Sequence, residues 1–208
     1  MFAAATAFLW VRLKHAQELD AQIIHAANSN DAAGVSRLLA AGANPNAEDE
    51  IWLGGPQPLS DRLNIIGARL VGNRYYQNRT ALMIATSLDN KAMVQNLLTH
   101  GAKVDRESEI GMTPLMAAID SRDLSLVKLL IAHGAGVNHE DDGGRTPIFY
   151  VLYTSNGGRT IPAGMAQTLV AAGANINARD RGHRTVLDLA KGRQRADVVA
   201  LFQSLGAK

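Results

Sequence analysis

The sequence predicts an all-α solenoid, a stack of similar helix-turn-helix units, and two recurring patterns predict it. The first is a Gly-Ala pair whose glycine stands at positions 42, 101, 134, 173 and 206. The steps between successive glycines are 59, 33, 39 and 33 positions, so two steps share one length and the others are longer. A recurring period of this length is typical of repeat proteins, in which each unit packs against its neighbours.

The second pattern is a threonine that opens a short apolar segment in the same register. It occurs at Thr80, Thr113, Thr146 and Thr185, which precede the next Gly-Ala pair by 21, 21, 27 and 21 positions. Threonine caps the free backbone N–H groups at a helix start, and the proline that follows Thr113 and Thr146 is tolerated at the first helical position. We therefore expect a first helix to begin after each threonine.

A second, longer helix follows the first one in each unit. Apolar residues at i, i+3 and i+4, as in Val94, Leu97 and Leu98, form one stripe along such a helix. The glycine of each Gly-Ala pair then ends the helix, because glycine readily adopts the left-handed conformation that closes many helices. Each unit is thus a turn, a short helix, a turn, a longer helix, a glycine stop and an extended connection.

These motifs together resemble the ankyrin-repeat family. The matching segments are Thr113-Pro114-Leu115, His100-Gly101-Ala102, His133-Gly134-Ala135 and the link at 175–180. Five repeats in one register, with a divergent first and last repeat, cover nearly the whole chain from about Ala21 to Ala207. The resemblance implies short β-turn or hairpin fingers between the repeats and a function in binding other proteins.

The chain departs from the family pattern at helix starts and finger turns. The family often has histidine as the fourth residue of a Thr-Pro-Leu-His start, where this chain has Met83, Met116, Phe149 and Asp188. We expect packing to replace any hydrogen-bond network of that histidine in three repeats. His183 and Asn78 stand where the family prefers the turn glycine found at Gly111 and Gly144, and both residue types tolerate a positive φ angle better than most.

Composition limits the classes of function. The 208-residue chain has 47% hydrophobic residues, no cysteine and a net charge of +2. Disulfides and thiolate metal sites are therefore excluded, and no Lys/Arg run of the nucleic-acid-binding type occurs. The segment from Arg179 to Lys208 is locally basic, with seven basic and three acidic side chains, and we interpret it as the solvated outer face of a terminal repeat.

The segment 1–20 forms an apolar extension before the repeat domain at 21–208. Residues 2–11 carry no charge, and Arg12 and Lys14 follow. About ten residues span only half of a bilayer core. One interpretation is a helix through Leu9, Leu13, Ala16 and Leu19 that docks on or leads into the first repeat. The other is the end of a membrane anchor, with the repeats on the cytoplasmic side.

The longest interval between successive Gly-Ala pairs contains an insertion at 48–78. Gly and Pro residues at 54–58 interrupt the chain, and Leu59, Leu63, Ile66 and Leu70 then fall on one face of a helix. As structure, the insertion is a lid that folds over neighbouring repeats. As function, it is a docking element, because it contains aromatic and arginine residues of the kind enriched at interface hot spots. The candidate contacts are Trp52, Arg62, Arg69, Tyr75 and Tyr76.

A second, shorter insertion lies within 154–161, between the two helices of the fourth repeat. We interpret it as a flexible connector. The preceding helix has Phe149, Tyr150 and Tyr153. We expect Phe149 and Tyr150 to pack in the core, since aromatic residues at helical spacing usually do. Tyr153 stands at a position that, by resemblance, faces the concave groove.

Finger and groove positions are the contact residues that the resemblance implies. On the first helices these are Ser87, Asp120 and Tyr153. On the fingers they are Glu107, Glu109, Glu140, Asp141, Asp142, Arg179 and Arg181. The middle two fingers are acidic and the last is basic, a polarity that favours a partner with complementary charge order.

Only the run His139-Glu140-Asp141-Asp142 resembles a set of metal ligands. Adjacent side chains on a finger point apart, so we interpret these residues as solvated turn acids. No hydrolase, zinc-protease, phosphate-loop or dinucleotide motif occurs, and we name no catalytic residue, metal or cofactor.

The sequence therefore predicts a non-catalytic protein–protein interaction module, monomeric and cytoplasmic, that binds another protein and no nucleic acid. The alternatives are an adaptor or sensor tethered to the cytoplasmic face of a membrane through residues 2–11, and a small-ligand or enzymatic pocket under the insertion.

Overall fold

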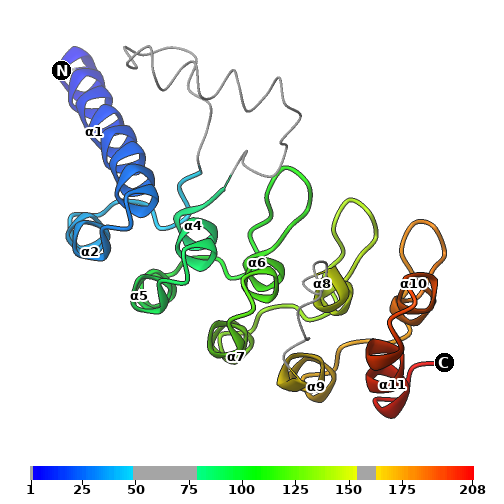
Figure 1. The fold of residues 1–208 in the computed structure, drawn as a ribbon. Coiled ribbons are helices and arrows are strands. Elements are labelled where there is room, and N and C mark those ends of the chain that lie inside the picture. Colours follow the sequence, from blue (N-terminus) through cyan, green and yellow to red (C-terminus); the bar gives the residue numbers. More distant parts are fainter. Residues whose placement is uncertain (1, 49–78, 154–162) are drawn as a thin grey trace, which may run out of the picture. The chain divides into compact units, whose positions relative to one another are not determined.

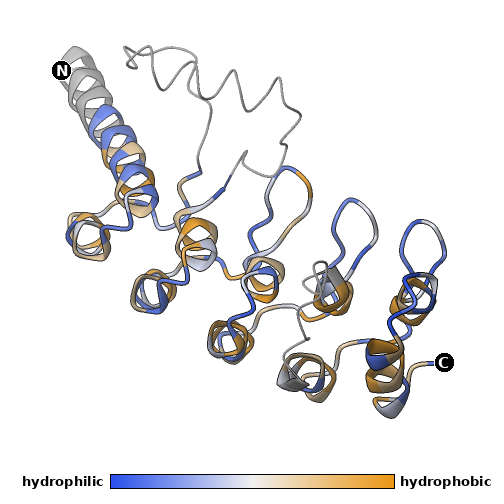
Figure 2. Ribbon diagram, in the orientation of Figure 1, coloured by the Kyte–Doolittle hydropathy of each residue, from blue (hydrophilic) through white to orange (hydrophobic). Residues whose placement is uncertain are grey.

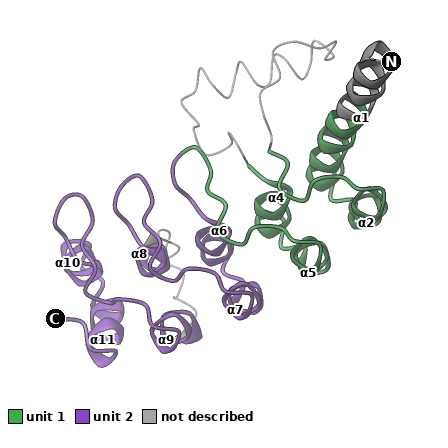
Figure 3. Cartoon of the chain, turned by 180° about the vertical axis from the view of Figure 1, so that it is seen from behind, with its two compact units in different colours: residues 1–109 green, residues 110–208 purple. Residues whose placement is uncertain are grey.

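The computed structural model describes residues 2–48, 79–153 and 163–208 (Figure 1). The chain divides into two compact units, residues 1–109 and 110–208 (Figure 3). The expected contacts Trp52, Arg62, Arg69, Tyr75 and Tyr76 lie outside the described residues, as does the connector at 154–161, so these expectations stay predictions.

The described residues of the first unit form two helix pairs. Helix α1 packs against α2 and α4, α4 packs against α5, and α2 packs against α5 (Figure 1). Their bounds are Phe2–Asn28 for α1, Ala32–Ala40 for α2, Ala81–Ser87 for α4 and Lys91–Thr99 for α5. Each first helix therefore contacts the next first helix, and each second helix contacts the next second helix.

The described residues of the second unit repeat this arrangement with three more pairs. Within it α6 packs on α7 and α8, α8 on α9 and α10, α7 on α9, and α10 on α11. Their bounds are Pro114–Asp120 for α6, Leu124–Ala132 for α7, Pro147–Tyr153 for α8, Ala163–Ala171 for α9, Val186–Gly192 for α10 and Ala196–Ser204 for α11. The described residues contain no strand, only an isolated bridge between Glu48 and Thr80. The prediction of an all-α repeat solenoid is confirmed.

Threonine side chains start the short helices as predicted. The hydroxyl oxygens of Thr80, Thr113 and Thr185 accept hydrogen bonds from the backbone N–H three residues later, at 3.3, 3.4 and 3.1 Å. In the fourth repeat the buried hydroxyl of Thr146 has no hydrogen-bond partner in the described part of the chain. This helix start therefore lacks the side-chain cap found in the other three.

Glycine ends the longer helices in each repeat. The five glycines of the Gly-Ala pairs have φ between +87° and +95°. After α5, the N–H of Gly101 donates to Leu98 O at 3.1 Å and the N–H of Ala102 donates to Leu97 O at 3.0 Å. This pair of bonds satisfies the last carbonyls of the helix. A Cβ atom at any of the five would meet nothing within 4 Å, so the positive φ alone explains the glycine.

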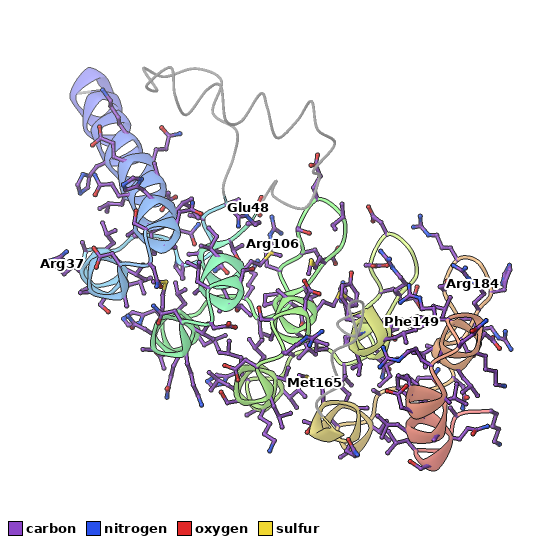
Figure 4. The ribbon with its side chains drawn as sticks, in the orientation of Figure 1. Arg37, Glu48, Arg106, Phe149, Met165 and Arg184 are labelled. Atoms are coloured by element: carbon purple, nitrogen blue, oxygen red, sulfur yellow. The ribbon has the colours of Figure 1, made fainter. Side chains whose placement is uncertain are left out.

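The apolar helix faces form the core of each unit (Figure 2). Met83, Met116 and Phe149, which replace the family histidine, are at most 3% exposed, as expected for packing. Phe149 of α8 and Met165 of α9 are both buried in the second unit (Figure 4). The fourth such residue, Asp188, instead accepts a hydrogen bond from the N–H of Thr185 at 2.9 Å and completes a capping box.

The N-terminal extension is part of a continuous helix, because α1 runs from Phe2 to Asn28. Its C-terminal half packs in the first unit, where Leu19, Ile23 and Ala27 are buried, while Ala16 is exposed. Among the described residues, no helix has a stretch both long enough and apolar enough to cross a bilayer.

Asparagine side chains join successive repeats within each unit. The side-chain amide of Asn46 donates to the carbonyl of Gly101 at 3.2 Å. The amide of Asn138 donates to Gly173 at 2.9 Å in the same way. Both accepting carbonyls belong to the glycine stop of the following repeat, so the bonds fix the stacking of neighbours.

Candidate functional site

The finger loops of the second unit form the candidate functional site. We call residues 136–145 the acidic finger and residues 175–184 the basic finger. The N–H of Arg181 in the basic finger donates to Gly143 O of the acidic finger at 2.8 Å, and the N–H of Asp142 donates to Ile110 O at 3.0 Å. These bonds hold neighbouring fingers side by side and fix their backbones relative to each other.

A buried aspartate organises the acidic finger. The side chain of Asp141 is fully buried and accepts from the backbone N–H groups of Gly143 and Arg145 at 2.7 and 2.9 Å. It also accepts from Arg145 Nε and from the Tyr150 hydroxyl, both at 2.8 Å. The predictions that Asp141 contacts a partner and is a solvated turn acid are therefore wrong. Its carboxylate is enclosed because it serves as the hydrogen-bond acceptor of its own finger.

The basic finger has the same arrangement of hydrogen bonds around Asp180. This residue is 6% exposed and accepts from the backbone N–H, Nε and Nη2 of Arg184 at 2.9, 3.1 and 2.8 Å (Figure 4). Burial raises the pKa of Asp180, but the backbone N–H and guanidinium of Arg184 outweigh it and leave the pKa below its usual value. Each finger thus neutralises its internal carboxylate with its own arginine.

The residues on either side of each buried aspartate point into solvent. Glu140 and Asp142 are exposed in the acidic finger, and Arg179 and Arg181 are exposed at the same two positions of the basic finger. Arg179 Nη1 also donates to His183 O within its own finger, at 2.6 Å. The structure therefore places two negative charges next to two positive charges on adjacent, hydrogen-bonded loops.

Close contact between fingers explains two of the turn glycines. A Cβ atom on Gly111, at φ +72°, would lie 2.9 Å from Asp142 N, and one on Gly144, at φ +71°, would lie 3.0 Å from Arg181 N. Both positions therefore need glycine for its φ angle and for space. The equivalent residue of the last finger, His183, has φ +59°, as its expected tolerance of positive φ allows.

The predicted residues on the first helices occupy the same position within their helices. Ser87, Asp120 and Tyr153 are the last residues of α4, α6 and α8. Ser87 and Asp120 are exposed, and the Ser87 hydroxyl donates back to Met83 O at 3.0 Å. Glu107 is an exposed finger residue of the first unit.

The first unit has its own polar arrangement at the base of the 48–78 insertion. Glu48, which precedes the insertion, pairs in an antiparallel bridge with Thr80, which follows it. The carboxylate of Glu48 also forms an ion pair with Arg106 of the next finger (Figure 4). The two ends of the insertion therefore meet at one place on the first unit.

The described residues show a surface depression and no cluster of metal ligands. No group of three or more histidine and acidic side chains there is arranged to hold a metal ion. The depression is lined by Lys103, Asp105, Arg106 and Glu107. Small-molecule pockets are lined mainly by apolar side chains, and this depression is lined by charged ones. The alternative of a pocket under the insertion concerns residues outside the described part of the chain and stays a prediction.

Sequence reasoning missed the internal Asp-Arg pairs of the fingers. Asp141 with Arg145 and Asp180 with Arg184 have the same i, i+4 spacing, and the offset between the two pairs equals the step between the Gly-Ala pairs of their repeats. An Asp-Arg pair that recurs at the same distance before its helix start indicates an aspartate that organises its own finger rather than one that contacts a partner. The bond from Tyr150 to Asp141 has no such signal, because the last repeat has Leu189 in its place.

A comparison with protein families agrees with this repeat structure. The family model described as ankyrin repeats (3 copies) matches residues 23–141, more than half of the chain. No curated protein matches the chain. Ankyrin repeats generally mediate protein–protein interactions, and proteins built from them are typically non-enzymatic. With five helix pairs in register among the described residues and this match, the chain belongs to the ankyrin-repeat family.

Proposed function

We propose that the protein is a non-catalytic binding module that recognises a partner protein through its fingers and its 48–78 insertion. The observation that carries this proposal is the pair of adjacent fingers, whose exposed charges stand on a backbone fixed by hydrogen bonds. A surface that is already ordered loses little conformational freedom when a partner binds. Further proposed contacts are the exposed residues Asp120 in the second unit and Ser87 and Glu107 in the first unit.

The insertion is the second proposed docking element. Its sequence holds Trp52, Tyr75 and Tyr76, and aromatic residues dominate the binding energy of many interfaces. Its ends meet through the bridge between Glu48 and Thr80, which is the geometry of a hairpin base. Shortening the chain between these ends should therefore leave the first unit folded.

Affinity purification with two forms of the chain tests this function. One form is intact, and the other has residues 50–78 replaced by Asn-Gly, a dipeptide that closes a two-residue hairpin. Circular dichroism verifies that the repeat helices are folded in both forms. Proteins recovered with the intact chain are identified by mass spectrometry, purified and tested for direct binding.

We expect the intact chain to bind a purified partner and the shortened form to bind it at least about thirtyfold more weakly, because the loss of one hot-spot aromatic residue costs about 2 kcal/mol or more. Equal binding by both forms would remove the insertion from the proposal and leave the fingers. A folded intact chain with no direct binder would argue against a binding module altogether.

A further inference from the structure

The acidic and basic fingers have opposite charges at equivalent positions. Glu140 and Asp142 flank the buried Asp141, and Arg179 and Arg181 flank the buried Asp180. Each charged residue of one finger is separated from its counterpart by the step between the two repeats. The sign of the exposed charge therefore reverses between two loops that have the same internal hydrogen-bond arrangement.

The other charges of the two fingers cancel within each finger. Arg145 pairs with Asp141 at 2.7 Å, and Arg184 pairs with Asp180 at 2.8 Å. Beside the basic finger, the carboxylate of Asp188 interacts with both Arg179 and Lys191, so one neighbouring negative charge faces two positive ones. The exposed surface keeps two negative charges on one finger and two positive charges on the next.

Direct pairing between the two fingers does not remove this polarity. Among the described residues, no ion pair within 4.0 Å joins Glu140 or Asp142 to Arg179 or Arg181. All four side chains are exposed, while the backbones beneath them are joined by the bond from Arg181 N to Gly143 O. The charges are thus held in a fixed order but are accessible to a partner.

The spacing of the fingers sets the spacing required of a partner. Helices of adjacent repeats pack about 10 Å apart, and an extended chain advances about 3.3 Å per residue, so roughly three residues span two fingers. We infer that the partner docks an extended segment with a basic group and an acidic group about three residues apart, the basic group on Glu140 and Asp142 and the acidic group on Arg179 and Arg181. This inference rests on the proposed function and specifies the chemistry of the partner.

Selection from a random peptide library tests the inference. Peptides of about 12 residues, roughly 40 Å when extended, are displayed on phage and selected on the full chain. Three further forms are selected in parallel: E140K/D142K, R179E/R181E, and a control, K91E/K128E, which makes the same charge change as R179E/R181E at exposed positions on helices. Circular dichroism verifies that all forms are folded.

We expect the wild type and the control to enrich peptides with basic and acidic residues about three positions apart. E140K/D142K should enrich acidic peptides and R179E/R181E basic ones. Synthetic peptides selected on the wild type should bind each finger variant about tenfold more weakly, as the loss of two exposed ion pairs predicts, and all binding should weaken with salt.

Three results would overturn the inference. If all four forms enrich the same peptides, binding is independent of the fingers, although the binding module itself stands. A wild type that enriches no peptide would count against both the inference and the proposed function. A wild-type dimer that both finger variants convert to a monomer would assign the surface to a second copy of the chain.

Discussion

The Tyr150 hydroxyl donates to the buried carboxylate of Asp141 at 2.8 Å, and the last repeat has no equivalent of this bond. We predict that Tyr150→Phe lowers the free energy of unfolding by about 2 kcal/mol, because a hydrogen bond to a charged group contributes about 1.5–3 kcal/mol. Urea denaturation followed by circular dichroism measures the change.

A double-mutant cycle separates this bond from general packing effects. Tyr150→Phe, Asp141→Asn and the double variant should show a coupling energy of at least about 1 kcal/mol, as residues in direct contact do. Additive effects of the two substitutions would contradict a direct bond between these side chains.

Residues other than glycine occupy strained backbone positions at the turns between paired helices. Asn30, Asp89, Arg122 and Gln194 have φ between +53° and +65°. The left-handed conformation costs an ordinary residue about 1–2 kcal/mol, whereas glycine loses up to about 1 kcal/mol of backbone entropy. Since Gln194 is exposed, we predict that Gln194→Gly stabilises the protein by about 0.5–1 kcal/mol.

Gln194→Ala is the matched control, because it removes the same side chain but keeps the Cβ atom that causes the strain. Thermal denaturation of both variants should show a higher midpoint for glycine than for alanine. If alanine stabilises as much as glycine, the glutamine side chain rather than the backbone is the source of the strain.

The roles of individual finger residues were only partly predictable from the sequence. Glu140, Asp142 and Arg181 were predicted to be finger residues, and all three are exposed. Asp141 was predicted to be a contact, yet it is buried, because its finger folds around its carboxylate. Sequence position shows that a residue lies on a finger, but which side chains turn inward depends on the hydrogen bonds that the loop makes after folding.

At the scale of elements, the fingers depend on close contact between loops. Gly144 and Gly134 both have positive φ, but only Gly144 would bring a Cβ atom to 3.0 Å from the next finger, at Arg181 N. Both alanine variants should lose about 1–2 kcal/mol to backbone strain, and Gly144→Ala about 1–3 kcal/mol more to steric overlap. Equal losses in chemical denaturation would show that the fingers do not pack as described.

The helices of the last repeat are expected to be sensitive to acid. Hydrogen bonds from Thr185 lower the pKa of Asp188, and the hydrogen bond from Arg195 holds the pKa of Asp197 at about 2. Both pKa values lie below those of the unfolded chain, which are about 3.9. The stabilisation is therefore present above about pH 4 and is lost as the pH falls through the folded-state values.

Melting curves between about pH 5 and pH 2 test this expectation for α10 and α11. We predict that Asp188→Asn makes the melting temperature fall less steeply with acid, because the residue no longer titrates, while asparagine still accepts from Thr185. If the melting temperature of Asp188→Asn falls with pH as steeply as that of the wild type, Asp188 does not contribute to the loss of stability in acid.

Helices were the elements that the sequence predicted best. The threonine starts and glycine stops bracket α4 with α5, α6 with α7, and α10 with α11, since these caps are local interactions between residues close in sequence. The continuity of α1 was harder to predict, because no cap separates residues 2–20 from the first repeat. Contacts such as Glu48 with Arg106 join residues 58 positions apart and leave no local pattern.

At the scale of the whole molecule, each unit obtains its core by stacking helix pairs on their neighbours. The evenly spaced Gly-Ala pairs therefore reflect the stacking of helix pairs that stabilises each unit. The departures from this even pattern distinguish the chain from a regular array. The departures are the 48–78 insertion and the charge reversal between the acidic and basic fingers. The central claim is that these departures, rather than the faces of the repeated helices, provide most of the binding energy for a partner protein.

Titration calorimetry with the partner protein that is recovered by affinity purification tests this claim most directly. The partner is titrated into the intact chain, the R179E/R181E variant and the K91E/K128E control. We predict saturable binding by the intact chain and the control, and binding about tenfold weaker by the finger variant. Equal affinity for all three forms, or a loss confined to the helix control, would contradict the claim.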